Sequence, residues 1–171
     1  MLLNFSKEVP KQLVFKNVVE YLLSQNLKID SQDENRPWGG FFVLDENTLD
    51  KFIHLYFSHL TKGEINISGK LSPKILIVAP AKRLSWQYHN RRAEIWKLIG
   101  GTTGVITSDT DYEKEIISLK IGDIIQIEQG QRHRLIGLNS WGIVAEIWQH
   151  TDINNPSDEN DIVRVQDDFG R

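Results

Sequence analysis

The sequence contains no cysteine. Disulfides, thiolate metal sites and a cysteine nucleophile are therefore excluded. No apolar run approaches the roughly 20 residues of a membrane helix. The opening stretch MLLNFSKEVPKQ is too polar for a signal peptide. We therefore expect a cytoplasmic protein that does not associate with a membrane.

Basic residues are slightly fewer than acidic ones. The chain has 20 Lys and Arg against 23 Asp and Glu, which gives a net charge of −3 and a pI near 5.9. This balance argues against nucleic acid as the main partner, although it is compatible with a local basic pocket. At 171 residues, 40% of them hydrophobic, the chain fits one globular domain.

Helical patterns are confined to the first part of the chain. Apolar residues recur at helical spacing in residues 10–27 and again in residues 47–60. The polar stretch 30–40 contains a proline and glycines and predicts a linker. We therefore predict a helical extension over residues 1–35 and a helical insertion near residues 45–70.

The remaining chain has the pattern of short strands. A strand is predicted at residues 40–44 and a last one at 161–166. Between them, starting with EINISG (64–69), about nine short segments rich in β-branched and aromatic residues follow one another. No helical pattern separates them, so a parallel α/β sheet is excluded. An all-β sandwich or barrel over residues 36–171 is predicted.

Four side chains with metal-ligand chemistry lie in two of these segments, LSWQYHNRRAEIWKLIGG and QRHRL. Residues two apart on a strand share a face, so Gln87 and His89 point the same way. Glu94 follows a turn and returns on the neighbouring strand, and His133 comes from a later hairpin. An amide, two imidazoles and a carboxylate inside a barrel suit one divalent ion: zinc, iron, manganese, cobalt or nickel. The alternative is that the histidines are satisfied core residues and the other two side chains are solvated.

The spacing resembles the paired motifs of the cupin family. In the first motif, Gln87 stands where the first histidine is usual, and His89, Glu94 and Gly101 fall at the expected intervals. His133 matches the histidine of the second motif. The resemblance implies a cupin double-stranded β-helix, or jelly-roll barrel, with a metal inside.

Five segments carry a narrower resemblance: RPWGGFFVL (36–44), LSWQYHNRRAEIW (84–96), HRL (133–135), AEIWQ (145–149) and ENDIVRVQDDFGR (159–171). They are similar to type II mannose-6-phosphate isomerases and to the isomerase domain of bifunctional mannose-6-phosphate isomerase/mannose-1-phosphate guanylyltransferases. The Gln-x-His start is specific to this branch of the cupins. The resemblance therefore implies that Gln87 is an ordinary ligand.

An aldose–ketose isomerase is the function that this resemblance implies. Mannose 6-phosphate and fructose 6-phosphate are the expected substrate and product, and zinc is the first expectation for the metal. Such a reaction moves a proton between C1 and C2 through a cis-enediol, which requires a Lewis acid and a general base. We assign Lys74, Glu146 and Arg134 to catalysis. The base is left open between Lys74 and Glu146, since Lys74 could be a solvated strand residue and Glu146 an arginine partner.

Arginine suits a phosphate because its fork matches two phosphate oxygens. We assign Arg83 and Arg92 to substrate binding. Trp148 joins them, because it replaces a valine of the family and would narrow the cavity. Further cations that could reach the site mouth, or only pack and pair with acids, are Arg36, Arg164 and Arg171.

Two other function classes stay open. A non-catalytic sugar-binding cupin would keep the ligands but lack a placed base. Another cupin metalloenzyme, such as a dioxygenase, would hold iron and consume oxygen. The expected partners are a small-molecule sugar phosphate and a second copy of the chain, because small cupins commonly form homodimers. The apolar stripe of the N-terminal helix could contribute to that interface or could equally lie on its own barrel.

Overall fold

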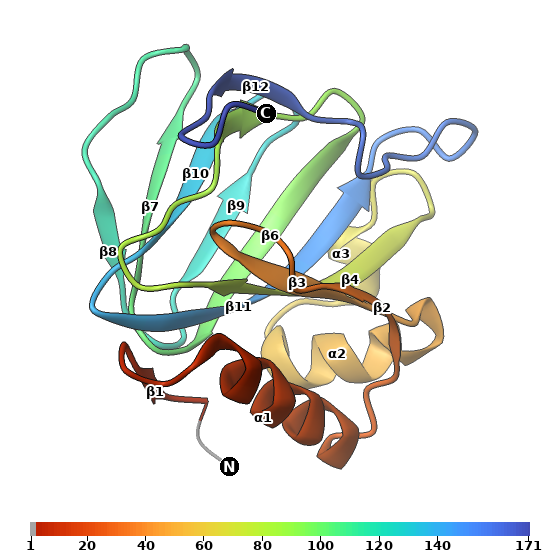
Figure 1. Cartoon of the computed structure of the whole chain (residues 1–171). Coiled ribbons are helices and arrows are strands. Elements are labelled where there is room, and N and C mark those ends of the chain that lie inside the picture. The colour runs from red at the N-terminus through yellow and green to blue at the C-terminus, as the bar shows by residue number, and fades with distance from the viewer. Residues whose placement is uncertain (1–2) are drawn as a thin grey trace.

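The computed structural model describes residues 3–171, and its strands form two antiparallel sheets (Figure 1). The larger sheet has the order β2-β3-β4-β11-β6-β9, with β1 beside β11, and the smaller has the order β12-β5-β10-β7-β8. This confirms the all-β prediction. The strands are β1 (Phe5–Ser6), β2 (Ile29–Asp33), β3 (Gly39–Leu44), β4 (Leu71–Val78), β5 (Trp86–Tyr88), β6 (Arg92–Gly100), β7 (Thr103–Ser108), β8 (Ile117–Leu119), β9 (Ile124–Ile127), β10 (Arg132–Gly137), β11 (Ser140–His150) and β12 (Val163–Gln166).

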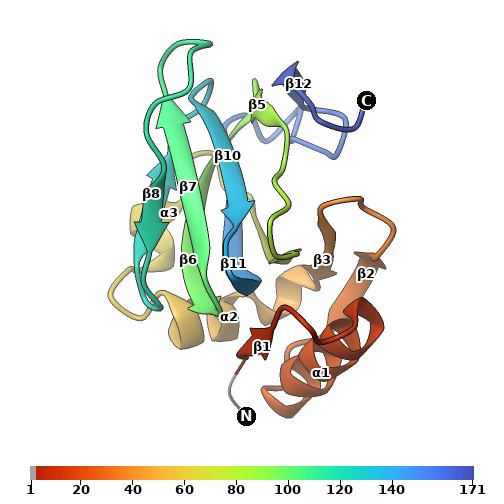
Figure 2. The ribbon, with the colours of Figure 1, turned by 60° about the vertical axis from the view of Figure 1, so that its left-hand side comes forward.

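The helices cover the outer face of the larger sheet, away from the smaller sheet (Figures 1 and 2). They pack on it through one apolar cluster that includes Phe15 and Phe52 from the helices and Ile77 from β4. None of the helices described in residues 3–171 has the length and apolar character to cross a bilayer. The helices are α1 (Lys11–Ser24), the 3₁₀ turn η1 (Glu46–Thr48), α2 (Leu49–Tyr56) and α3 (Lys62–Ile65).

The strands of the larger sheet divide their side chains between two cores. On β11, Ile143, Ala145 and Ile147 belong to the cluster under the helices, whereas Val144 belongs to the cluster between the sheets. Alternation along a strand explains this division. The same alternation turns Glu146 and its neighbours on β4 and β6 toward the space between the sheets, where a site can form.

Two local predictions were wrong. The predicted linker at 30–40 contains β2, which pairs with β3 at the edge of the sheet. An edge strand has one neighbour and tolerates polar side chains, so its composition looks like a loop. The predicted strand at 64–69 is instead the end of α3 and a turn. That helix starts with a capping box, in which the Thr61 hydroxyl accepts from the backbone N–H of Glu64.

The helix predictions at 10–27 and 47–60 are confirmed, although α1 and α2 are both shorter than the predicted ranges. Residues 3–35 also contribute β1 and β2 to the larger sheet, in addition to α1. The segment between β3 and β4 holds η1, α2 and α3. The last predicted strand, at 161–166, corresponds to β12.

Candidate metal centre

Three of the predicted ligands converge in the space between the sheets. His89 follows β5, Glu94 lies on β6 and His133 lies on β10. One ligand atom from each residue lies within 4.8 Å of the others, and all three side chains are buried. Glu94 Oε1 is 3.2 Å from His89 Nε2, and Glu94 Oε2 is 3.4 Å from His133 Nε2.

Backbone carbonyls set the tautomer of both histidines. The Nδ1 of His89 lies 2.5 Å from the main-chain oxygen of Asp161, and the Nδ1 of His133 lies 2.9 Å from that of Gln131. A carbonyl oxygen only accepts hydrogen bonds, so each Nδ1 carries the hydrogen. Each Nε2 therefore keeps a lone pair, and both lone pairs are on the side of Glu94.

The protonation states also match those of metal ligands. Burial lowers the pKa of His89 to about 3 and lowers the pKa of His133, so both rings are neutral at pH 7. Burial acts to raise the pKa of Glu94, but His89 and Arg92 outweigh it and hold that pKa below its ordinary value. Among the described residues, Glu94 Oε2 and His133 Nε2 are buried without a hydrogen-bond partner. Two neutral imidazoles and a carboxylate with buried free acceptors fit a divalent metal.

Gln87 lies beside this group, as the strand pattern predicts. It is the cross-strand partner of His133 on β5 and β10. Its Nε2 is 3.4 Å from His89 Nε2, and its Oε1 accepts a hydrogen bond from the Ser85 hydroxyl at 2.6 Å. The structure thus brings Gln87 to the group with its amide nitrogen, not its oxygen, toward His89.

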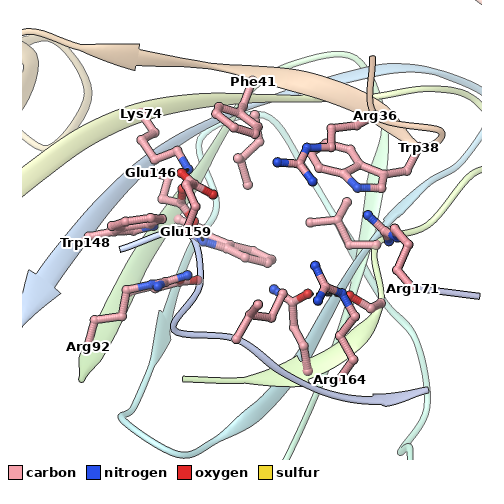
Figure 3. A pocket seen from close by; sticks show the side chains of 17 residues that line it. Arg36, Trp38, Phe41, Lys74, Arg92, Glu146, Trp148, Glu159, Arg164 and Arg171 are labelled. Atoms are coloured by element: carbon pink, nitrogen blue, oxygen red, sulfur yellow. Dashed lines mark hydrogen bonds and ion pairs between the residues drawn. The ribbon is translucent and has the colours of Figure 1, made fainter. Parts of the chain in front are cut away.

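A cavity opens beside the ligand group and encloses about 580 Å³ of empty space, including its mouth. Gln87 and Glu94 contribute to its wall. Figure 3 shows that the labelled side chains other than Phe41 gather at two ends. At one end lie Lys74, Arg92, Glu146, Trp148 and Glu159, and at the other lie Arg36, Trp38, Arg164 and Arg171.

Glu146 is the buried carboxyl at the first end. Its Oε1 accepts a hydrogen bond from the Trp96 indole N–H at 2.8 Å. Burial and the nearby charge of Glu94 raise the pKa of Glu146 to about 8, although Lys74 and Arg92 act in the opposite direction. The structure therefore places this predicted catalytic residue in the cavity, with a pKa near neutrality.

Lys74 lies on the same wall. Its ammonium donates to Glu159 Oε1 at 2.6 Å. It also lies 4.1 Å from the ring centroids of both Phe41 and Trp148. Lys74, Trp148 and Glu159 line a second, neighbouring cavity too, so they form the partition between the two spaces.

Arg92 contacts two residues of the His-Glu-His group. Its Nε donates to Glu94 Oε1 at 2.7 Å, and its Nη2 lies 3.0 Å from His89 Nε2. Its guanidinium carbon is 3.7 Å from the centroid of the Trp148 ring. A buried arginine with these partners neutralises the charge of Glu94 and forms part of the cavity wall.

Three arginines line the opposite end of the cavity. Arg36 pairs with Asp33 at 2.8 Å, and Arg171 pairs with Asp167 at 2.7 Å. Arg164 has no carboxylate within 4.0 Å among residues 3–171, and its Nε is buried without a partner. Burial, and then the charge of Arg171, lower the pKa of Arg164. Asp167 acts in the opposite direction, and Arg36 adds a smaller lowering effect. This end of the cavity therefore holds excess positive charge.

The structure does not bring the other two predicted arginines into the cavity. Arg83 forms a two-pronged ion pair with Asp168. Arg134 is the next residue after His133 on β10, so strand alternation turns it to the opposite face. There it pairs with Glu113 and donates to Gln166. The cations at the site mouth are instead those of the RPWG stretch and the tail.

Two antiparallel sheets around a buried His-Glu-His group that could hold a metal ion define a barrel of the cupin class. Solved structures agree with this fold. Oxalate decarboxylase from Bacillus subtilis has a TM-score of 0.57 at 16% identity, covering 79% of this chain and 30% of that chain. Vicilin from tomato, Solanum lycopersicum, has a TM-score of 0.53 at 18% identity, covering 81% of this chain and 35% of that chain.

Residues 59–167 match the family described as mannose-6-phosphate isomerase C-terminal, and the chain belongs to that family. The resemblance read from its motifs is thereby confirmed. Xanthan biosynthesis protein XanB of Xanthomonas campestris pv. campestris is 31% identical over 136 residues, covering 80% of this chain and 23% of the relative. Alginate biosynthesis protein AlgA of Pseudomonas aeruginosa is 30% identical over 139 residues, covering 80% of this chain and 22% of the relative. The chain thus spans less than a quarter of the length of these curated relatives.

Proposed function

We propose that the protein is a metal-dependent aldose–ketose isomerase that converts mannose 6-phosphate to fructose 6-phosphate. The observation that carries this proposal is the position of Glu146. It is a buried carboxyl outside the ligand group, it faces the same cavity, and its pKa is raised to about 8. The family match supports the same reaction class.

The proposed metal ligands are His89, Glu94, His133 and Gln87. Gln87 would present its oxygen after a half-turn of its amide, and the Ser85 hydroxyl can then accept from the amide N–H instead of donating. Zinc is the first candidate, because neutral imidazoles and one carboxylate suit it at an open site. A bound divalent metal supplies Lewis-acid stabilisation of the charge that develops on the substrate oxygens.

Glu146 is the proposed general base. In the forward direction its carboxylate takes the proton from C2 of mannose 6-phosphate, which yields the cis-enediolate with its negative charge on O1. The resulting carboxylic acid returns a proton to C1, while the hydroxyl proton passes from O2 to O1 to complete the ketose. Lys74 lies directly across the strand pair from Glu146 and is the proposed donor to these oxygens.

The phosphate is proposed to bind at the arginine end. Arg164 is the anchor, since it has no carboxylate partner among residues 3–171 and its neighbours Arg36 and Arg171 add positive charge. Arg164 is also the cross-strand partner of Gln87 on β12 and β5. A substrate that reaches from the ligand group to Arg164 would place its sugar carbons along the cavity wall.

The test is the turnover of mannose 6-phosphate to fructose 6-phosphate by metal-loaded protein, with His89→Ala as the control. Turnover that disappears in the variant supports the isomerase and its metal centre together. A wild-type protein that binds one metal per chain and the sugar phosphate, but gives no product, overturns the isomerase. That result favours a non-catalytic sugar-binding cupin.

A further inference from the structure

The segment between β11 and β12 packs against the loop that carries His89. Asp161 in this segment is buried, and its carboxylate accepts two backbone hydrogen bonds from that loop. Asn90 N–H donates to Oδ1 at 3.0 Å, and Arg91 N–H donates to Oδ2 at 2.9 Å. The carboxylate therefore holds the two residues that directly follow His89.

The same residue also contacts the His89 ring. The main-chain oxygen of Asp161 accepts from His89 Nδ1 at 2.5 Å, across 72 residues of sequence. A metal-bound histidine almost always donates its other ring N–H to such an acceptor, which fixes its tautomer and ring orientation. The carboxylate of Asp161 holds the backbone next to His89, and the main-chain oxygen of Asp161 orients the His89 ring.

Ser157 connects Asp161 to a second proposed ligand, Glu94, through Arg92. Its hydroxyl donates to Asp161 Oδ2 and accepts from Arg92 Nη1, both at 2.7 Å. Arg92 in turn donates to Glu94 Oε1 at 2.7 Å. Ser157, Asp161 and Arg92 are all buried, so the chain of contacts is shielded from water.

We propose that the Ser157–Asp161 segment is an integral part of the metal centre and that Asp161 is the positioning residue for His89. This inference rests on the metal centre of the proposed function. Asp161 is outside the His-Glu-His group and acts through the ring that it orients. Assembly of a high-affinity site therefore depends on docking of this C-terminal segment, more than 60 residues beyond the ligands on β5 and β6.

The test compares zinc affinity by chelator competition in the wild type, Asp161→Asn and Asp168→Asn. Asp168 is the matched control, because it is an aspartate of the same tail whose ion-pair partner among residues 3–171 is Arg83, away from the ligand group. Loss of a contact of this kind weakens metal binding by about 10- to 100-fold. We expect that loss for Asp161→Asn and a change of less than about twofold for Asp168→Asn.

Cobalt(II) provides a readout that a purely structural role would not move. Its visible absorption band reports ligand geometry, so we expect a changed band shape in Asp161→Asn and an unchanged one in Asp168→Asn. If Asp161→Asn does not fold, Ser157→Ala replaces it, since it removes the hydroxyl bridge but keeps the carboxylate. We expect Ser157→Ala to weaken zinc binding in the same direction.

The failures of the two proposals are distinguishable. Wild-type protein that binds zinc while the folded Asp161→Asn and Ser157→Ala variants stay within twofold of it, with an unchanged cobalt band, overturns this inference alone. Wild-type protein that binds zinc but turns over no mannose 6-phosphate overturns the isomerase and leaves this inference standing. Wild-type protein that binds no divalent metal overturns both.

Discussion

Lys74 and Glu146 are cross-strand partners on β4 and β11, and both face the cavity. The ammonium of Lys74 lowers the pKa of Glu146, but burial and Glu94 have the larger effect and leave it at about 8. A carboxyl in this state takes up and releases a proton near neutrality, as a general base must. The pair therefore offers a base and a cation on one wall.

Replacing Glu146 with glutamine tests this assignment. Gln retains the shape and can still accept the hydrogen bond from Trp96, but it cannot take a proton. We expect kcat to fall by about 100-fold or more, the usual size of a general-base contribution. Zinc affinity, measured by chelator competition, should stay close to that of the wild type.

Glu128→Gln is the matched control for this variant, because Glu128 is an exposed residue after β9. Its kcat should equal that of the wild type. A Glu146→Gln enzyme with near-normal kcat would assign the base to another residue.

Metal removal should destabilise the protein. Zinc at 100 times its dissociation constant stabilises a native state by about 2.7 kcal/mol. For a chain of this size, that corresponds to a rise in Tm of roughly 5–10 °C. The measurement is a thermal melt with zinc and with a chelator. In Glu94→Gln the Tm difference between the zinc and chelator samples should shrink to a small fraction of the wild-type value. A wild-type Tm that does not change with zinc would contradict the metal site.

The ligand group could be predicted because its geometry is local. Alternation places Gln87 and His89 on one face, and a single turn returns Glu94 beside them. The same rule excludes Arg134 from the site, because it is adjacent to the inward-facing His133 on β10. The contact between Asp161 and His89 could not be predicted in this way. An irregular segment that docks onto a distant loop leaves no periodic pattern in the sequence.

The two candidate phosphate contacts can be separated experimentally. In the described part of the chain, Arg164 is the cavity arginine that lacks a carboxylate partner, and Arg164→Met removes it. Arg83→Met instead removes an arginine that pairs with Asp168 outside the cavity. A charge-assisted hydrogen bond contributes about 1.5–3 kcal/mol, so we expect KM for mannose 6-phosphate to rise about 10- to 100-fold in Arg164→Met. Arg83→Met should stay within about twofold of the wild type. A larger rise in KM for Arg83→Met than for Arg164→Met would instead assign the phosphate site to Arg83.

His150 makes stability depend on pH. Its Nδ1 accepts from Ser157 N–H at 2.9 Å, so its Nε2 carries the hydrogen and donates to the Ser72 hydroxyl, also at 2.9 Å. Ser72 in turn donates to Glu46 at 2.6 Å. Neither ring nitrogen is free to take a proton. Burial, and then Lys70, lower the pKa of His150 to about 4, although Glu46 acts in the opposite direction.

A folded-state pKa below the ordinary value of 6.5 means that the unfolded chain binds the proton more readily. The stabilisation from a neutral His150 is therefore complete above about pH 6.5 and is lost as the pH falls toward 4. His150→Asn keeps an acceptor for Ser157 N–H but cannot titrate. We expect the free energy of unfolding of the wild type to fall by about 1–2 kcal/mol more than that of the variant between pH 7 and pH 5. Urea titrations of both proteins with chelator present measure this difference, because the other histidines then contribute equally to both. Parallel pH profiles would show that His150 takes up a proton without cost in the folded protein.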